Sequence, residues 1–446
     1  MRVIIIGAGE VGQNIANTLS GGGHEVTVVD GDAARVGRLQ NDLDALILHG
    51  NGASPRMLQQ LNVGQADLLL AVTQSDEVNT IAALSAHLLG TDRTVARVRD
   101  EDYFGTDDSF AHDVLGIDFV IHPERATAED LAEAIRLPGA VRVEYFGDGH
   151  IAVAECIVTE TSALVGCSVA DRRILRPHYI VGYVRDGVPL TARPDDRMLI
   201  GDRVLVAAAR EDIALVVADL AGGGARQVRD VLIFGGGRVG FPLARRLETY
   251  GDLSVMVMER DEHRARYIAE RLPRSTVLHE EGVGKEEMLR HSVDRVGAFV
   301  ACAGDDRSNL LAALHAQQLG ARLCMAVVSR QEFVPLVAAM GIDVAYSPRL
   351  ATAEAILRFV RGEQVRAMHL LFSGAELLEL YVEPGAEIDG AELADFRIPN
   401  GGQAAALLRG DKVVLPHDGV RIQGHDRVLL FGPRGSSTDV ERHFIA

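Results

Sequence analysis

The chain has 446 residues, 47% of them hydrophobic, and a formal net charge of −18 at pH 7, and this length exceeds what one hydrophobic core organises. The acidic balance opposes binding to nucleic acid or to an anionic lipid surface, because either partner would need a concentrated basic face. No apolar run approaches the roughly 18 residues of a membrane-spanning helix, and no signal peptide precedes the first strand, so we expect a soluble, cytoplasmic, multidomain protein without direct membrane insertion.

The first apolar run, residues 3–6, is too short for a helix and predicts a buried parallel strand. The turn Gly7-Ala8-Gly9-Glu10-Val11-Gly12 follows at once and has the G-x-G-x-x-G pattern. Its glycines permit, in turn, a tight bend, close approach of a pyrophosphate to the backbone, and packing of the next helix on the sheet. That helix would present a partly positive N-terminus to an anion. A ligand-free strand-to-helix turn fits the pattern about equally well.

The residues after this turn predict an α-helix, because Val11, Ile15, Ala16 and Leu19 form one apolar stripe. Further strands are expected at residues 25–29, 45–49, 68–72, 94–98 and 119–122, with helical stretches between them. This alternation predicts a doubly wound parallel sheet of the Rossmann type over residues 1–137. Its ligand crevice would lie beyond the carboxyl ends of the strands.

Polar residues follow the carboxyl ends of these strands. Asp30 ends the second strand about 20 residues after the glycines, where a carboxylate would bind ribose and repel a 2′-phosphate, so NAD is favoured over NADP. Asn51 would suit adenine or ribose, and Arg97 or Arg99 would suit a phosphate. Loop solvation, helix capping by Ser75 or Asp76 and ordinary surface arginines explain each stretch taken singly. Their convergence on one sheet edge favours a binding site.

The character of the sequence changes after Leu137. Short strand-like segments at residues 142–146, 150–157, 180–185 and 203–208 are separated by Asp-Gly and glycine-rich turns. They predict a small β-rich module over residues 138–221, and nothing in it suggests catalysis. The three glycines at residues 222–224 indicate a flexible joint.

The first pattern then returns over residues 228–362. A strand at residues 231–234 leads into Gly235-Gly236-Gly237-Arg238-Val239-Gly240, and the next strand ends in Glu259. Residues 367–446 form a second strand-rich module. We therefore expect a tandem duplication, in which two Rossmann-like α/β domains are each followed by a small β-rich α+β domain.

The second copy departs from the first in ways that would weaken an anion site. Val327 aligns with Arg97, and Glu280-Glu281-Gly282 aligns with the Asn51 loop, so a phosphate-binding cation is lost and carboxylates are gained. Pro242 falls in the opening turns of the helix, where the first N–H groups lack partners anyway. We therefore assign a nucleotide switch chiefly to the first copy and leave binding at the second open.

No stretch indicates a catalytic or metal site. The four cysteines, Cys156, Cys167, Cys302 and Cys324, form no C-x-x-C pair and lack a metal-site spacing with histidine. No histidine or lysine is placed for hydride transfer, and neither a G-x-S-x-G nor a Walker A lysine motif occurs. An NAD-dependent dehydrogenase is still the enzymatic alternative, since half of the chain has the matching fold pattern.

The chain resembles the TrkA family in its duplicated four-part order and in four motifs, which are Gly7-Ala8-Gly9-Glu10-Val11-Gly12, Asp30, Ala71-Val72-Thr73-x-x-Asp76-Glu77-x-Asn79 and Ala96-Arg97-Val98-Arg99. Members of this family are cytosolic regulatory subunits of Trk-type potassium uptake systems, built from RCK domains, also called KTN domains. The resemblance covers essentially the whole chain. The duplication with paired β-rich modules is more specific than the glycine motif alone.

The resemblance implies a homotetramer whose eight nucleotide-binding lobes form a ring beneath a membrane potassium channel subunit of the TrkH/TrkG type, at the inner face of the cell membrane. It implies NAD(H) and ATP or ADP as ligands, which change ring shape and channel gating without an enzymatic reaction. By position, Gly7, Gly9 and Gly12 would lie against phosphate, Asp30 on ribose, Asn51 near adenine, Thr73 and Asp76 at the pocket mouth, and Arg97 on phosphate. A regulatory subunit of another cation transporter or antiporter is the alternative.

Overall fold

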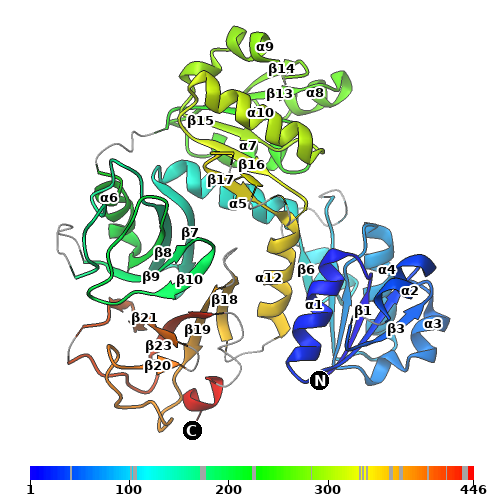
Figure 1. The fold of residues 1–446 in the computed structure, drawn as a ribbon. Coiled ribbons are helices and arrows are strands. Elements are labelled where there is room, and N and C mark those ends of the chain that lie inside the picture. Colours follow the sequence, from blue (N-terminus) through cyan, green and yellow to red (C-terminus); the bar gives the residue numbers. More distant parts are fainter. Residues whose placement is uncertain are drawn as a thin grey trace.

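The computed structural model describes residues 1–40, 43–100, 103, 108–170, 177–222, 228–282, 284–330, 333, 336–337, 340–360, 365–370, 375–398, 401–417, 419–433 and 440–445. The strands of these residues form two parallel sheets, each in an α/β unit, and two antiparallel sheets, each in a small β-rich module (Figure 1). The predicted fold class is confirmed. Most of the predicted joint at residues 222–224 lies outside the described residues.

The first α/β unit has the predicted doubly wound sheet, with strand order β3-β2-β1-β4-β5-β6 and parallel pairing throughout. Its elements are β1 (Arg2–Ile6), α1 (Glu10–Gly21), β2 (Glu25–Asp30), α2 (Ala33–Leu39), β3 (Leu46–His49), α3 (Pro55–Gln60), η1 (Val63–Gln65), β4 (Leu68–Ala71), α4 (Asp76–Leu88), β5 (Arg93–Arg97), η2 (Phe110–Val114), β6 (Phe119–Ile121) and α5 (Pro123–Arg136). The strand order reverses between β1 and β4, which places the ligand crevice beyond their carboxyl ends. The predicted apolar stripe of α1 is buried, as expected of a helix that covers a sheet.

The second α/β unit repeats this topology, with strand order β14-β13-β12-β15-β16-β17. Its elements are β12 (Asp230–Phe234), α7 (Gly240–Glu248), β13 (Ser254–Glu259), α8 (Glu262–Ala269), β14 (Thr276–His279), α9 (Lys285–Arg290), η3 (Val293–Arg295), β15 (Ala298–Ala301), α10 (Asp306–Leu319), β16 (Cys324–Val327), β17 (Val344–Tyr346) and α12 (Pro348–Val360). Helix α7 begins at Gly240, whereas α1 begins at Glu10, the counterpart of Arg238. Pro242 explains this difference, because it has no N–H to donate to the Arg238 carbonyl.

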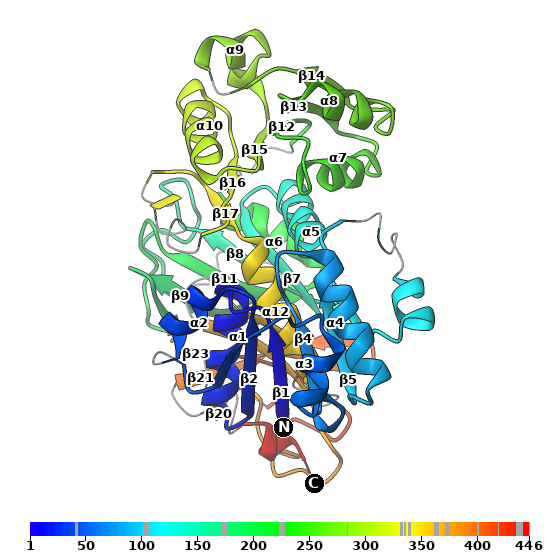
Figure 2. The same ribbon diagram turned by 90° about the vertical axis from the view of Figure 1, so that its right-hand side faces the viewer.

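The last helix of each α/β unit packs on the other unit. Helix α5 packs on α7, and its Leu131 lies in the same buried cluster as Leu243. Helix α12 runs beside α1, and its Ile356 shares a buried cluster with Ile15 of α1 (Figures 1 and 2). The two helices also contact each other. This exchange couples the two units mechanically, and the sequence analysis did not predict it.

The first β-rich module contains one strand and one helix that the sequence analysis did not predict, β10 and α6. Its elements are β7 (Ala140–Phe146), β8 (Ile151–Ile157), β9 (Tyr179–Arg185), β10 (Val188–Thr191), β11 (Arg203–Ala209) and α6 (Arg210–Leu220), with strand order β10-β9-β11-β8-β7. The helix buries an apolar face of Ile213, Val216, Val217 and Leu220. This face has the helical spacing that identifies such elements in a sequence.

The second β-rich module has strand order β18-β19-β23-β21-β20, with β22 paired to β21. Its elements are β18 (Val365–Leu370), β19 (Ala375–Tyr381), β20 (Arg397–Ile398), β21 (Gly402–Arg409), β22 (Lys412–Val414), β23 (Arg427–Pro433) and η6 (Glu441–Phe444). The modules share a buried cluster that includes Phe146 and Phe431. Gln403 Nε2 donates to the Val181 carbonyl at 2.6 Å across this interface. The β-rich modules therefore pack on each other, as the α/β units do through their helices.

No helix among the described residues combines the length and the apolar character needed to cross a membrane.

Candidate functional site

The two glycine turns have the same geometry. Gly7 has a φ of 110° and Gly235 a φ of 102°, a conformation that side-chain-bearing residues rarely adopt. A Cβ on Gly12 would collide with the Gly7 carbonyl oxygen, and one on Gly240 would collide with that of Gly235. The turn and the helix packing therefore both require glycine, as the motif predicts.

The middle glycines leave room for a ligand. A Cβ built on Gly9 or on Gly237 meets no atom within 4 Å. Such open space beside the start of a helix suits the close approach of a phosphate. The side chains of Val11 and Val239 are buried, so only their backbone could reach a ligand.

The acid at the end of the second strand is hydrogen-bonded to the glycine turn in both units. Asp30 Oδ2 accepts from the Ala8 amide at 2.6 Å, and Glu259 Oε2 accepts from the Gly236 amide at 2.8 Å. Asp30 is buried and also forms an ion pair with Arg35 at 2.9 Å. A ribose at Asp30 would therefore share its carboxylate with Arg35 or displace that guanidinium.

In each α/β unit, an asparagine that the sequence analysis did not assign to the site joins the loop after one strand to the end of the neighbouring strand. Asn79 Oδ1 accepts from the Thr73 amide at 2.8 Å, and its Nδ2 donates to the Arg97 carbonyl at 2.8 Å. Asn309 makes the same bonds to Ala303 and Val327. The repeated asparagine at the same place in both copies was the signal that could have identified it.

Two other predicted site residues hold loops. Asp76 is buried and accepts from the backbone amides of Arg99 at 3.1 Å and Asp100 at 3.0 Å. The exposed Asn51 accepts from the Ala53 amide at 3.0 Å, in the manner of an Asx turn. The roles predicted for Asp76 at the pocket mouth and for Asn51 at adenine stay predictions.

Arg97 is buried beside Glu124 of α5, with 3.8 Å between Arg97 Nη2 and Glu124 Oε1. Burial lowers the pKa of Arg97 and raises the pKa of Glu124, while each charge partly offsets the effect on the other. Arg97 Nε and Glu124 Oε2 have no hydrogen-bond partner among the described residues. Because buried polar atoms are normally satisfied, this pair is a place where a further polar group would fit.

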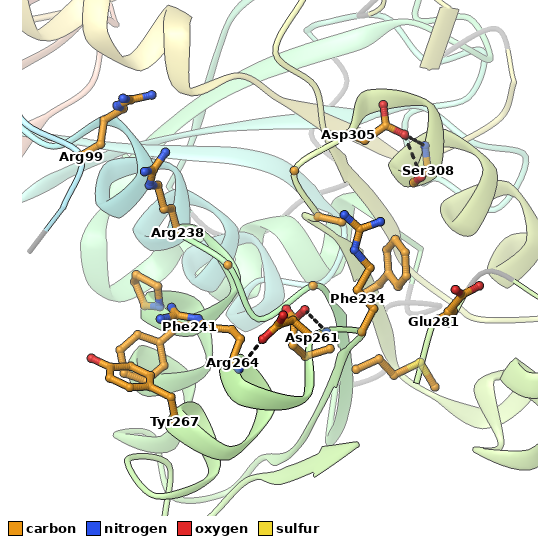
Figure 3. Close-up of a pocket in the computed structure, with 18 of the residues that line it drawn as sticks. Arg99, Phe234, Arg238, Phe241, Asp261, Arg264, Tyr267, Glu281, Asp305 and Ser308 are labelled. Carbon is orange, nitrogen blue, oxygen red and sulfur yellow. Dashed lines mark hydrogen bonds between the residues drawn. The ribbon is translucent and has the colours of Figure 1, made fainter. Parts of the chain in front are cut away.

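A pocket of about 830 Å³ lies at the glycine turn of the second unit (Figure 3). Gly235, Gly237 and Arg238 line it from the turn, and Glu259 lines it from the end of β13. Four of the residues predicted for the second copy thus meet at one pocket, in the copy that the sequence analysis judged the weaker.

Among the lining residues that were absent from the predicted site, Phe241, Arg264 and Tyr267 stack on one another. The Arg264 guanidinium lies 5.4 Å from the Phe241 ring centroid and 4.9 Å from that of Tyr267, and its Nε donates to the Gly236 carbonyl at 2.9 Å. This stack gives the pocket a cationic and aromatic wall. Arg264 follows Glu259 by the same spacing as Arg35 follows Asp30, and this repeat could have identified it.

Arg99 and Asp100 also line this pocket, although both belong to the first unit. The sequence analysis placed Arg99 at the first copy with Arg97. In the structure these arginines separate, with Arg97 beside Glu124 and Arg99 at the second pocket.

The described residues contain no group of three histidine, cysteine or acidic side chains that could hold a metal ion. The four cysteines are buried, and burial raises the pKa of Cys156 and of Cys324 to about 12.

The fold and the two glycine turns define a tandem Rossmann-type protein with paired β-rich modules. The model of the TrkA-N domain family matches residues 3–123 and 231–348. The Trk system potassium uptake protein TrkA of Halomonas elongata is 33% identical over 100% of this chain and 98% of its own length, and the TrkA of Haemophilus influenzae is 30% identical over 97% and 95%. The chain therefore belongs to the TrkA family.

A solved structure described as the GsuK channel bound to NAD superposes with a TM-score of 0.63, at 17% identity, over 99% of this chain and 78% of that chain. The structure of the same channel bound to ADP has a TM-score of 0.52 at 14% identity, over 80% and 69%. At this level of identity the likeness shows the fold alone. The TrkA relatives are named for potassium uptake, so this is a transport family and not a family of enzymes.

Proposed function

We propose that the protein is the nucleotide-sensing regulatory subunit of a Trk-type potassium uptake system. In this proposal it acts in the cytoplasm as a homotetrameric ring, attached to the inner face of the membrane through a channel subunit of the TrkH/TrkG type. The observation that carries the proposal is the duplicated glycine turn, closed in both copies by a hydrogen bond from the turn to Asp30 or Glu259.

The ligands proposed are NAD(H) and ATP or ADP, which share an adenosine and a phosphate chain. The space at Gly9 and Gly237 would receive phosphates, and Asp30 and Glu259 would accept bonds from ribose hydroxyls. Arg97 Nε, which has no hydrogen-bond partner among the described residues, could donate a hydrogen bond to a ligand of the first unit. The GsuK structures with NAD and with ADP bound agree with these two ligand classes on the same fold.

The protein's part in gating would be to convert binding into movement of one α/β unit against the other. Helix α5 follows the first unit in the chain and packs on α7 of the second, whereas α12 follows the second unit and packs on α1 and β6 of the first. A shift of one unit would therefore move a helix that is covalently joined to the other. A ligand moves such an equilibrium only by its differential affinity for two shapes, and a tenfold preference contributes about 1.4 kcal/mol per site. Several coupled sites in one ring would multiply this bias.

The proposal is tested by titrating the full chain with NADH and with ADP in a calorimeter and then recovering the ligand. We expect saturable binding and unchanged ligand, because no residue is assigned to chemistry. Absence of binding to either ligand would refute nucleotide sensing. Oxidation of NADH in the presence of a small carbonyl substrate would instead revive the dehydrogenase alternative.

A further inference from the structure

The second pocket lacks its own counterpart of Arg97, since Val327 occupies that position. Its own unit supplies Arg238 and Arg264 to the lining, but its strand β16 offers no cation at the position of Arg97. The first unit supplies a further guanidinium group, because its Arg99 lines this pocket.

Arg99 is held in place by its own unit. Asp76 accepts from the Arg99 backbone amide at 3.1 Å, and Asp76 Oδ1 lies 3.4 Å from Arg99 Nε. The Arg99 side chain also donates to the Gln74 carbonyl. A side chain fixed in this way loses less conformational entropy when it binds a ligand than a free surface arginine does.

Arg238 is the second cation at this end of the pocket. It follows Gly237 directly, is exposed, and has no hydrogen bond or ion pair with any residue that the structure describes. Figure 3 shows Arg238 next to Arg99 at the same end of the pocket. Asp76, which pairs with Arg99, and Glu124, which lies near both arginines, partly offset the repulsion between the two guanidinium groups. Arginine binds phosphate oxygens in a bidentate manner, so an anionic phosphate between the two groups would offset it further.

Several carboxylates of the pocket are already engaged with backbone amides. Glu259 accepts from the amides of Gly236 and Asp261, Asp261 accepts from the Arg264 amide at 2.7 Å, and Asp305 accepts from the Ser308 amide at 3.0 Å. These bonds fix the acids at helix and turn starts. Such bonds favour the ionised form of a carboxylate, so these acids oppose an anion and a phosphate chain would have to lie at the arginine end of the pocket.

We propose that the second pocket is a composite site, in which Arg238 and Arg99 of the other unit together bind the phosphate chain of an adenine nucleotide. The inference rests on the proposed function and specifies its second site. Recognition through two arginines selects nucleotides with at least two phosphates, such as ADP, ATP or NAD, over adenosine. It also makes binding at this pocket depend on how the two units are placed.

The test uses the full chain with its first cradle blocked by Gly9→Asp. The new side chain meets open space, so folding is expected to be unaffected, while its carboxylate repels phosphate. In this background we compare Arg99→Ala, Arg238→Ala and the control Arg56→Ala, which changes an exposed arginine of α3 outside the pocket. Calorimetry then gives the Kd for ADP and for adenosine.

We expect Arg99→Ala and Arg238→Ala each to raise the Kd for ADP about 10- to 100-fold, the range for one charged hydrogen bond. The Kd for adenosine and all values for Arg56→Ala should change by less than about twofold. If Arg99→Ala lowers the unfolding temperature, Arg99→Lys and Arg238→Ala carry the test. A lysine keeps the charge but not the bidentate geometry, so Arg99→Lys should lie between Ala and wild type.

An unchanged ADP affinity in both alanine variants, with Gly237→Asp removing ADP binding from the same background, would overturn the composite site and leave the proposed function intact. If the wild-type chain, the Gly9→Asp chain and the Gly237→Asp chain all bind no nucleotide, that result refutes both the proposed function and this inference.

Discussion

Arg349, near the start of α12, forms an ion pair with Glu10, the first residue of α1 in the other α/β unit. The matching positions carry the opposite charges, since Glu124 corresponds to Arg349 and Arg238 corresponds to Glu10. Each glycine turn thus has a charged side chain of its own and an opposite charge on the helix that arrives from the other unit. The exchange of the last helices therefore brings charge, as well as apolar surface, to the other unit's turn.

Removing Arg349 should weaken nucleotide binding at the first turn, because Glu10 would then repel a phosphate without compensation. The pair is partly exposed, so we expect a loss of about 0.2–1 kcal/mol, which is up to about fivefold in Kd for ADP. The measurement is calorimetry on Arg349→Ala in a Gly237→Asp chain, where only the first turn can bind. Adding Glu10→Gln should restore the affinity, and a double-mutant cycle without coupling would show that the pair is irrelevant to binding.

Asp30→Ala should weaken NADH binding and also reduce stability. The change leaves the Ala8 amide and the Arg35 guanidinium without this acceptor, at a cost of about 1–3 kcal/mol. Chemical denaturation measures the second effect and calorimetry the first. Arg35→Ala is the matched control, because it frees the carboxylate and should leave NADH affinity equal or higher. An unchanged NADH affinity in Asp30→Ala would remove Asp30 from the ribose site.

The two β-rich modules contain the same arginine–aspartate pair. Removing the pair from each module in turn tests whether it contributes equally to the stability of both. Arg185 donates to Asp202 at 2.9 and 2.7 Å, and Arg409 donates to Asp426 at 2.9 and 2.7 Å. Because each buried carboxylate loses bonds to a charged group, Asp202→Asn and Asp426→Asn should each lower the free energy of unfolding by about 1.5–3 kcal/mol at pH 7. A loss in only one variant would show that the modules are energetically unlike.

The Asp202 pair also predicts a pH dependence. Burial would raise the pKa of Asp202, but hydrogen bonds from Arg185 and the Leu199 amide outweigh it and hold the pKa below its ordinary 3.8. A carboxyl with a lowered folded pKa stabilises fully above its unfolded pKa and loses this contribution as the pH falls through the folded pKa. The difference in unfolding free energy between wild type and Asp202→Asn should therefore be constant above about pH 5 and shrink below about pH 4. A difference that grows on acidification would contradict the pairing.

The thiols should be inert in the folded chain. Burial raises the pKa of Cys156 and Cys324 to about 12 and that of Cys302 still further, and only the thiolate reacts. Iodoacetamide at pH 8 should leave these three residues unlabelled by mass spectrometry until guanidinium unfolds the protein. Labelling of Cys302 within minutes would mean that the core behind the second glycine turn opens.

The strands of the first α/β unit were predictable to within a residue because each is a short apolar run that ends at a glycine or a polar residue. Pro242 and the third glycines were also interpreted correctly, since their effects are local. The exchange of α5 and α12 was not predictable, because an apolar helical face such as that of Leu131 does not specify which sheet it covers.

The same difficulty explains why the position of Arg99 at the second pocket could not be predicted. In the sequence it follows Arg97 by two residues, at the end of one strand, and either arginine was expected to suit a phosphate of the first copy. Once α5 and α12 bring the units together, the first arginine lies beside Glu124 and the second reaches the other unit's pocket. A cation at an interface cannot be assigned to a site before the interface is known.

Potassium flux through liposomes that contain a Trk channel subunit and this protein tests the central claim most directly. We predict that at least one of ATP, ADP, NAD and NADH changes the flux. The response should disappear in a Gly9→Asp/Gly237→Asp chain that still binds the channel. A flux that is the same with every nucleotide, while the wild-type chain is bound to the channel, would contradict the account.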